Sequence, residues 1–208
     1  MFITFEGIDF CGKSTQVELL KKYLEQNDHK IVIIREPGGT EISEKVRDIL
    51  LDKKNNMMFI ETEILLFAAS RSQLVREKIR PFLNENYYVI SDRFHDSTTA
   101  YQGYGRGLPV EIVNNIHNLS IGETIPDITF FIDIPVEEAE RRKATLGSRS
   151  LDRIEVSANN FYEKVRHGYL EIAARQKRFK VINGMMSIEE IHKQILNEIS
   201  LLQKKELN

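Results

Sequence analysis

The chain has one cysteine, no long apolar run and almost no net charge, and each of these absences excludes a class of protein. The single cysteine, Cys11, excludes an internal disulfide framework and a zinc site built from cysteines. The first residues lack the basic segment and long apolar core of a signal peptide, and no apolar run approaches the length of a membrane span. We therefore expect a cytoplasmic protein that does not bind a membrane.

The charge balance argues against a nucleic-acid-binding protein. Lysine and arginine total 29 and aspartate and glutamate total 31, so the net charge is -2 and no overall basic field attracts DNA or RNA. Hydrophobic residues make up 41% and charged residues 29%, as is typical of globular proteins. Without a repeat, low-complexity tract or linker, the sequence predicts a single domain that spans residues 1–208.

Short apolar runs alternate with helical patterns from one end of the chain to the other. We expect strands at residues 2–6, 31–35, 87–91, 128–132 and 179–182. We expect helices at residues 14–27, 41–52, 60–84, 109–120, 136–146, 157–177 and 187–203. Each strand is nearly all apolar instead of alternating, which is typical of parallel strands covered on both faces. Five such strands with helical crossovers predict an α/β fold with a doubly wound five-stranded parallel sheet.

Residues 7–14 match the phosphate-binding loop pattern G-x-x-x-x-G-K-[ST], with an expected strand before them and an expected helix after them. In such a loop, backbone N–H groups wrap a polyphosphate, and the next helix turns its positive dipole end towards the same anion. Lys13 can reach the β- and γ-phosphates, and Ser14 can ligate Mg²⁺. The residues expected to bind ATP here are Gly7, Ile8, Asp9, Phe10, Cys11, Gly12, Lys13, Ser14 and Thr15.

Charged residues follow several expected strands, at the edge where parallel strands end and ligands bind. Asp9 comes after the first strand, Arg35 ends the second, and Asp92 and Arg93 follow the third. A carboxylate such as Asp92 beside a phosphate loop usually serves Mg²⁺, directly or through water. Arg93 can form bidentate hydrogen bonds with a second phosphate, one that belongs to an acceptor. The alternative is an aspartate that caps a turn and pairs with the arginine.

Three further segments suggest ligand contacts, each with a structural alternative. Phe67 and Arg71 are four residues apart on an expected helix, and their shared face could bind a planar base or belong to the core. Residues 97–107 begin with hydroxyls and amides that suit the edge of a base and end with three glycines that make the chain mobile; the alternative is a polar helix start followed by a loose loop. Residues 141–153 are basic and broken by Gly147, which indicates a closing lid or a solvated helix end.

The identity and order of these motifs resemble those of the thymidylate kinases over nearly the whole chain. The run Arg-Glu-Pro-Gly-Gly-Thr at residues 35–40 and the run Ala-Tyr-Gln-Gly at residues 100–103 are more specific to that family than the phosphate loop. The resemblance also rests on residues 6–9, 11–15, 92–94 and 151–155. It implies transfer of a phosphoryl group from MgATP to dTMP, which gives dTDP and ADP, and it implies a homodimer.

The resemblance also assigns roles on the acceptor side. It implies that Phe67 stacks on thymine, that Arg71 bonds the thymine O4, and that Asp9 meets the sugar 3′-OH. It implies that Tyr101 packs where a 2′-OH would sit, which favours deoxyribose. The other acceptor-site residues that it implies are Arg35, Arg47, Arg93, Ser97, Thr98, Thr99, Gln102 and Tyr169.

On the donor side, the resemblance implies that Arg142 lies on adenine and that Ser14 and Asp92 serve Mg²⁺. One position departs from the family pattern, which has glycine at position 10, or arginine in a branch whose loop supplies the catalytic cation. Phe10 stands there, so we expect the cation to come from the lid. The expected catalytic residues are therefore Asp9, Lys13, Asp92, Arg93 and a lid arginine, either Arg149 or Arg153.

Two other functions also fit a phosphate loop. The nearer is a kinase of another nucleoside monophosphate or of a deoxynucleoside, although an arginine that faces the base favours a carbonyl over an amino group. The more distant is a nucleotide-dependent switch, but the chain has no Asn-Lys-x-Asp guanine-reading motif. For Cys11 two hypotheses stay open, a reactive thiol activated by the loop and helix N-terminus, or an inert thiol buried beneath the loop.

Overall fold

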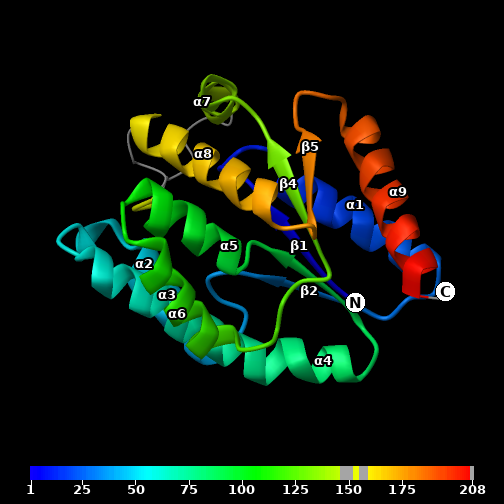
Figure 1. Cartoon of the computed structure of the whole chain (residues 1–208), viewed down its shortest axis with the longest axis horizontal. Coiled ribbons are helices and arrows are strands. Elements are labelled where there is room, and N and C mark those ends of the chain that lie inside the picture. Colours follow the sequence, from blue (N-terminus) through cyan, green and yellow to red (C-terminus); the bar gives the residue numbers. More distant parts are fainter. Residues whose placement is uncertain (146–151, 155–158, 207–208) are drawn as a thin grey trace.

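The computed structural model describes residues 1–145, 152–154 and 159–206. A five-stranded sheet in the order β2–β3–β1–β4–β5 lies at its centre (Figure 1). The strands are β1 (Phe2–Glu6), β2 (Ile31–Arg35), β3 (Tyr88–Asp92), β4 (Ile128–Asp133) and β5 (Phe179–Asn183). Every neighbouring pair is parallel, so the predicted sheet is confirmed, although β3 begins one residue later than the apolar pattern indicates.

Helices cover both faces of the sheet, as a doubly wound fold requires. Helices α1 (Lys13–Gln26) and α9 (Ile188–Glu206) pack together on one face, and α5 (His95–Thr98) and α8 (Asn159–Arg175) lie on the other (Figure 1). The other helices are α2 (Glu41–Leu51), α3 (Ile60–Leu74), α4 (Arg80–Asn84), α6 (Val110–Ile121) and α7 (Val136–Thr145), with a short 3₁₀ turn at Lys53–Asn55. A π-helical turn, Val75–Ile79, joins α3 to α4, so residues 60–84 are continuously helical as predicted.

One helical segment differs from the sequence prediction. Helix α5 continues into a π-helical turn, Thr99–Gly105, where the glycines suggested a mobile loop. These glycines instead permit close packing against α8. A Cβ on Gly105 would lie 2.6 Å from Phe161, and a Cβ on Gly168 would lie 2.7 Å from Tyr104. The two helical segments therefore approach closely because each carries a glycine at the crossing.

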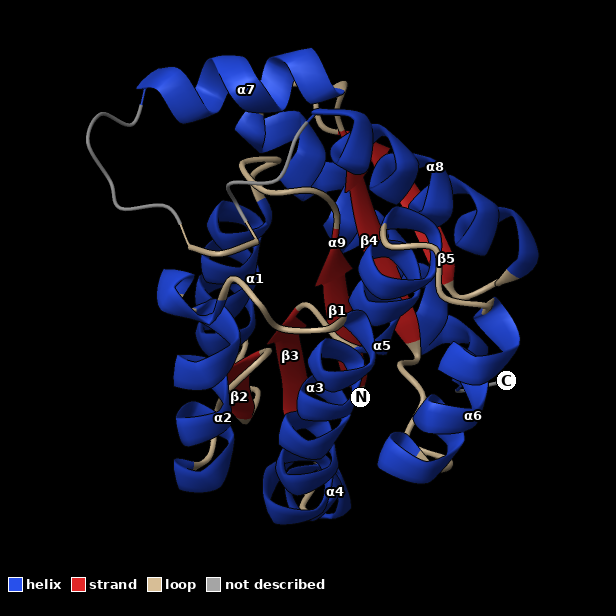
Figure 2. Cartoon of the chain, turned by 90° about the vertical axis from the view of Figure 1, so that its left-hand side faces the viewer, coloured by secondary structure: helices blue, strands red, loops and turns tan. Residues whose placement is uncertain are grey.

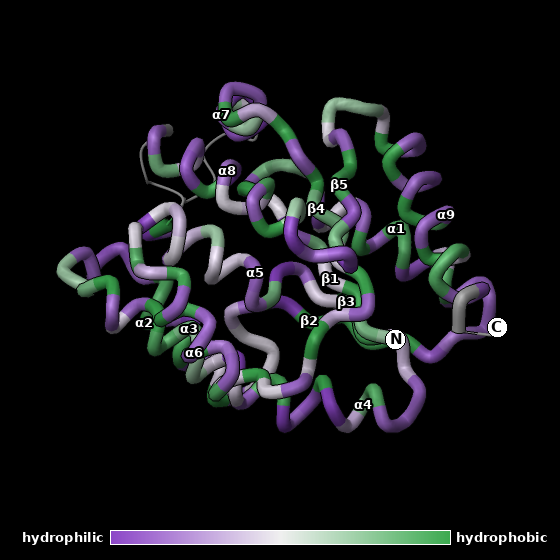
Figure 3. The backbone as a smooth tube through the Cα atoms, viewed as in Figure 1, coloured by the Kyte–Doolittle hydropathy of each residue, from purple (hydrophilic) through white to green (hydrophobic). Residues whose placement is uncertain are grey.

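The apolar core lies on both sides of the central strands. All five residues of β1 are buried, and Phe5 packs on Phe130 of the neighbouring β4. On α9, Ile191, Ile195 and Ile199 recur at helical spacing and are buried, and hydrophobic and hydrophilic stretches alternate along this helix in Figure 3. The edge strand β5 departs from the expected pattern, because Val181 is exposed. Within the described residues, no helix has the length and apolar composition that a bilayer crossing requires.

The register of the sheet sets the position of the site. Arg35 of β2 pairs with Asp92 of β3, and Asp92 pairs with Phe5 of β1. The carboxyl ends of these three strands are therefore nearly level. Figure 2 shows the strand arrowheads pointing to the end of the molecule where α7 lies. The segments that follow β1, β2 and β3 consequently begin at one edge, below α7.

Candidate active site

A cavity of about 820 Å³ opens at this edge of the sheet. Its walls come from the loop after β1, from β2, α2, α3 and α7, and from the segment that follows β3. Most of the residues that the sequence predicts for the site line it. They are Asp9, Phe10, Cys11, Gly12, Lys13, Ser14, Thr15, Arg35, Arg47, Phe67, Arg71, Asp92, Arg93, Ser97, Thr98, Tyr101, Gln102 and Arg142.

The phosphate loop turns sharply between β1 and α1 because its glycines adopt backbone angles that other residues avoid. Gly7 has a φ of 142° and Gly12 a φ of 103°. A Cβ on Gly7 would lie 2.7 Å from the carbonyl oxygen of Ile132, so a side chain would collide with β4. The ammonium of Lys13 donates to the carbonyl oxygens of Gly7 and Ile8, at 3.0 Å each. These bonds hold the lysine across the loop.

Phe10, which departs from the family pattern, has a φ of 65°. This left-handed conformation costs a non-glycine residue about 1 kcal/mol. Arg142 of α7 donates to the carbonyl oxygens of Phe10 and Cys11, at 3.5 and 3.3 Å, and to that of Gly184 beyond β5, at 2.9 Å. Helix α7 is thereby tied to the loop. Cys11 is buried, which agrees with the hypothesis of an inert thiol, whereas its Sγ lies 3.6 Å from the Lys13 ammonium, which agrees with the hypothesis of an activated thiol.

A hydroxyl and a carboxylate meet beside the loop, as a magnesium site requires. The Ser14 hydroxyl donates to the Asp92 carboxylate at 2.8 Å. Hard cations such as Mg²⁺ prefer oxygen ligands of this kind and fill the rest of their shell with water and phosphate. No group of three or more potential metal ligands of the His, Cys, Asp or Glu type occurs in the described part of the chain. The two residues thus fit an ion that substrate phosphates help to hold.

Arg93 lies at the centre of the site and contacts five groups. Its Nη2 forms an ion pair with Asp9 at 2.5 Å and donates to the Tyr101 hydroxyl at 3.1 Å. Its Nη1 donates to the carbonyl oxygen of Gly7, to Ser97 and to the Tyr169 hydroxyl. Burial alone would raise the pKa of Asp9, but the positive charges of Arg93 and Lys13 hold that pKa below its ordinary value. Asp9 is therefore an ionised acceptor beside the phosphate loop.

Behind Arg93 lies a buried acid that the sequence interpretation left without a role. The carboxylate of Glu6 accepts hydrogen bonds from the backbone N–H of Phe94 at 2.8 Å, from Ser97 at 2.6 Å and from Tyr169 at 2.8 Å. Burial, together with the negative charge of Asp96, raises the pKa of Glu6 to about 7. Glu6 thus fixes two of the hydroxyls that hold the Arg93 guanidinium.

A second buried arginine lies in another wall of the cavity, one helical turn from Phe67. The Nε of Arg71 donates to Glu36 at 2.6 Å, and its Nη2 donates to Thr98 at 2.9 Å. Burial raises the pKa of Glu36 to about 7 although Arg71 opposes this shift. Within the described part of the chain, the buried Nη1 of Arg71 and Oε1 of Glu36 have no hydrogen-bond partner. Unpartnered polar atoms buried in a cavity wall indicate a site for a polar ligand.

The structure places several predicted residues away from the cavity surface. Tyr169 is fully buried behind Arg93, and Thr99 points the other way, with its hydroxyl 2.9 Å from His117 Nε2. Arg153 forms an ion pair with Glu63 and does not line the cavity. Gly7 and Ile8 shape the loop without lining the cavity, and Arg149 lies outside the described residues.

The structure also adds residues that the sequence interpretation missed. Tyr162 of α8 brings its hydroxyl within 3.3 Å of Asp9, a contact that depends on how α8 packs and leaves no signal in the sequence. Met186, Ile188 and Ile191 form an apolar patch on the cavity wall that includes Arg142. A short apolar pattern after β5 cannot be distinguished from core by spacing alone.

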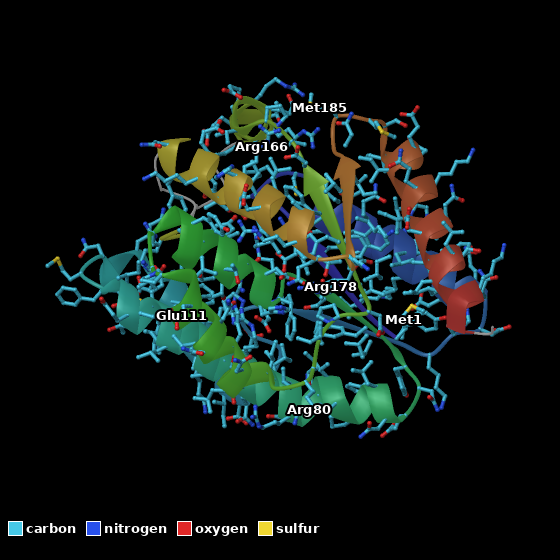
Figure 4. The ribbon with its side chains drawn as sticks, viewed as in Figure 1. Met1, Arg80, Glu111, Arg166, Arg178 and Met185 are labelled. Atoms are coloured by element: carbon cyan, nitrogen blue, oxygen red, sulfur yellow. The ribbon has the colours of Figure 1, made fainter. Side chains whose placement is uncertain are left out.

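A further arginine, Arg178, bonds the segment that carries Arg93. Arg178, labelled in Figure 4, lies between α8 and β5 and grips Asp96 of α5 with both Nη atoms, at 2.8 and 2.7 Å. Burial, together with the charges of Arg178 and Arg71, lowers the pKa of His95 well below its ordinary value, so this histidine is neutral. The start of α5 is therefore anchored by one buried ion pair.

A phosphate loop after β1, a serine–aspartate pair beside it and arginines along one edge of a parallel sheet define a nucleoside-monophosphate-kinase type of P-loop protein. The comparisons with known proteins agree with this class and narrow it. A family model described as Thymidylate kinase matches residues 5–195, and the chain belongs to that family.

Individual relatives cover almost the full length. The chain is 50% identical over 206 residues to a thymidylate kinase of Kosmotoga olearia, which covers 99% of this chain and 98% of the relative. It is 47% identical over 199 residues to a thymidylate kinase of Thermoanaerobacter sp., and the match covers 95% of this chain and 96% of the relative. The crystal structure of thymidylate kinase from Ehrlichia chaffeensis superimposes with a TM-score of 0.77 at 36% identity, with 96% and 98% covered.

The Glu6→Gln substitution is expected to change how stability depends on pH. The pKa of Glu6 is about 7 in the folded chain against an ordinary value of 4.5, so between these values the folded chain binds a proton that the unfolded chain does not. As the pH falls from 7 to 4.5, the wild type should therefore gain up to about 3 kcal/mol of unfolding free energy relative to the variant. Urea unfolding across this range measures the difference. A difference that does not vary with pH would contradict the assignment.

Proposed function

We propose that the chain transfers the γ-phosphoryl group of MgATP to dTMP, giving dTDP and ADP. The observation that carries this proposal is the Arg71 guanidinium. It is buried in the cavity wall beside Phe67, and its Nη1 has no partner among the described residues. A donor-only group in that place fits a base that presents a carbonyl oxygen, such as O4 of thymine, while the ring of Phe67 offers a flat apolar face.

The donor half of the cavity suits ATP. Gly12 and Lys13 present the N-terminus of α1, where backbone N–H groups and the helix dipole favour phosphate. When bound with ATP beside Ser14 and Asp92, Mg²⁺ would neutralise charge on the β- and γ-phosphates. Arg142 offers a flat guanidinium for adenine and is fixed by Glu138 and by the loop carbonyls that it bonds. The apolar side chains after β5 would cover the other face of that base.

The acceptor half offers three arginines for the phosphate of dTMP. Arg35, Arg47 and Arg93 all line the cavity, and they come from β2, α2 and the segment after β3. Planar guanidinium groups match phosphate oxygens two at a time. Arg93 has more hydrogen-bond partners than the other two: it bonds Asp9, the carbonyl of Gly7 and three hydroxyls, whereas Arg35 bonds Glu44 and Arg47 bonds the carbonyl of Pro37. Arg93 would hold the acceptor phosphate next to the phosphate loop.

Phosphoryl transfer between ligands held in this way needs positioning and neutralisation of charge. The acceptor phosphate oxygen attacks in line, and Lys13 stabilises the charge that develops on the transferred group. That oxygen is largely ionised at neutral pH, because the second pKa of a phosphate monoester is about 6, so no strong general base is needed. Asp9 and Tyr101, which both bond Arg93, would bind the sugar.

The choice of acceptor tests this proposal. With MgATP, the chain should phosphorylate dTMP, use dUMP several-fold less well because burial of the thymine methyl group contributes about 1 kcal/mol, and reject TMP that carries ribose. A panel of nucleoside monophosphates, assayed by ADP release, measures this preference. Release of ADP without an acceptor would favour a nucleotide switch, and preference for another monophosphate would favour a different kinase. Equal turnover of dTMP and ribose-TMP would contradict the role of Tyr101.

The source of the catalytic cation provides a second test. Phe10 leaves the loop without an arginine, so the residues expected from the sequence are Arg149 and Arg153 of the basic segment. Since Arg153 is paired with Glu63, Arg149→Ala should lower kcat by on the order of 10³ with little change in KM for dTMP, whereas Arg153→Ala should not. Steady-state kinetics of the two variants decide the matter. Near wild-type kcat in both would mean that this segment does not supply the cation.

We also propose that the chain forms a homodimer through α2, α3 and α6, which lie side by side in Figure 1. Large apolar side chains on this face are exposed to solvent, with exposed fractions of 74% for Phe59 and 80% for Leu119. The others are Ile42, Ile49, Leu65 and Ile112. Monomeric proteins rarely gather exposed apolar side chains of this size on neighbouring helices, and a second copy of the same face would bury them.

The Leu119→Glu substitution should weaken this dimer, because a carboxylate would have to be buried at the interface. Light scattering of the wild type should give about twice the monomer mass of 24.2 kDa, and the variant should dissociate on dilution. Leu201→Glu is the matched control, since Leu201 is an exposed leucine on α9, away from this face. A monomeric wild type, or equal behaviour of the two variants, would contradict the proposed interface.

A cytoplasmic location is part of the same proposal. It is supported by the single buried cysteine and by the near balance of charge. Substrates of the kind proposed are small soluble anions, so neither a membrane nor a nucleic acid is needed as a partner.

A further inference from the structure

Glu63 is a buried acid in the first turn of α3 that the proposed reaction does not use. Its side chain is only 3% exposed. It lies four residues before Phe67 and eight before Arg71, so the three side chains occupy one face of the helix. The two later residues line the nucleotide cavity, and Glu63 continues the same row towards the edge of that cavity.

Three side chains from two other segments converge on this carboxylate. Gln102 donates to Oε1 at 2.8 Å, and Arg106 donates to the same oxygen at 3.4 Å. Nη2 of Arg153 lies 2.6 Å from Oε2, a contact of opposite charges and not an aligned hydrogen bond. Gln102 belongs to the helical segment after β3 and Arg106 follows its last residue, whereas Arg153 belongs to the described residues 152–154. Glu63 therefore joins segments about 40 and 90 residues away in sequence to α3.

Arg153 makes further contacts that leave it little freedom. Its Nε donates to the carbonyl oxygen of Leu50 at 2.8 Å, and its backbone N–H donates to that of Leu51 at 3.2 Å. These carbonyls belong to the last turn of α2, where no later N–H of the helix is available as a hydrogen-bond donor and a positive charge is favourable. With its side chain only 10% exposed, Arg153 bridges the end of α2 and the start of α3.

The residues beside these contacts form part of the cavity wall. Asp152 and Ile154 flank Arg153 and line the cavity, although Arg153 itself does not. Leu51, whose carbonyl oxygen accepts from the Arg153 backbone, and Gln102, which donates to Glu63, line the cavity as well. One buried ion pair thus lies directly behind a wall that comes from three separate segments. Removing either charge would leave the other buried without compensation and would loosen that wall.

We propose that Glu63 and Arg153 form a positioning latch for the acceptor nucleotide: their ion pair fixes residues 152–154 and Gln102 against α3, and so sets the width of the pocket around the base held by Phe67. This inference rests on the proposed function, because it assumes that the acceptor nucleotide occupies this pocket. Both are positioning residues, since they act through the side chains around them. Arg153 then positions the wall of the acceptor pocket and does not contact the transferred phosphoryl group.

The test compares Glu63→Gln, which preserves the side-chain shape and removes the negative charge, Arg153→Gln, which removes the guanidinium, and the double variant. Calorimetric binding of dTMP without ATP should weaken about tenfold in each single variant, with a similar rise in KM for dTMP. The KM for ATP and kcat should stay within about twofold. Because one pair is removed in all three proteins, the double variant should bind no worse than the weaker single variant. Arg153→Lys should restore part of the affinity, since its ammonium can pair with Glu63.

The control is Arg175→Gln, which removes an exposed ion pair with Glu171 on α8 and should leave dTMP binding unchanged. Lower melting temperatures with unchanged dTMP affinity in the Glu63 and Arg153 variants would overturn the latch and leave a purely structural pair. A large loss of kcat in Arg153→Gln, with normal dTMP affinity and a nearly normal Glu63→Gln, would overturn it in favour of a catalytic arginine. Failure of the proposed function is a separate result, because the wild type itself would then neither bind nor phosphorylate dTMP.

Discussion

The ion pair between Asp9 and Arg93 joins the segment after β1 to the segment after β3, and the candidate site is arranged around it. Asp9 belongs to the phosphate loop, and Arg93 begins the stretch that carries Ser97 and Tyr101. Glu6 accepts hydrogen bonds from the backbone N–H of Phe94 and from the Ser97 hydroxyl, and Ser97 in turn accepts one from the Arg93 guanidinium. Since the pair is largely buried, loss of one partner would leave a charge that water cannot easily reach. The donor and acceptor halves of the cavity are therefore fixed relative to each other.

A cavity for two phosphate-bearing ligands must gather positive charge, and buried acids make this possible in the folded chain. Glu36 accompanies Arg71, Glu63 accompanies Arg153, and Asp96 accompanies Arg178 beneath the sheet edge. Each pair fixes the geometry of one arginine while it offsets part of the repulsion among them. The burial that raises the pKa of Glu36 to about 7 also keeps its partner Arg71 in one orientation, in which Nη1 has no partner among the described residues. Rigid placement of this kind is how a site achieves positional specificity.

Close packing of two helical segments decides where several of these side chains point. The crossing of the Thr99–Gly105 turn with α8 is possible because Gly105 and Gly168 lack side chains that would collide with Phe161 and Tyr104. The same crossing brings Tyr101 and Tyr162 to Asp9. Gly105, which suggested a mobile loop in the sequence, instead allows two helical segments to pack closely in the fold. A substitution at either glycine would shift these two tyrosines relative to Asp9.

The sequence by itself determined the elements that depend on local patterns: five apolar strands, the helices between them, and a phosphate loop whose glycines and lysine have fixed spacing. Because parallel strands end at one edge, the order of the strands also implies that Asp9, Arg35, Asp92 and Arg93 lie close together. Only the tertiary structure decided which side chains turn inward. Thr98 faces the cavity and Thr99 does not, although they are adjacent and alike, because successive side chains of a helix point about 100° apart. The partners of Glu6, Glu63 and Arg153 come from elements far apart in the chain, and such contacts are set by packing that no local pattern encodes.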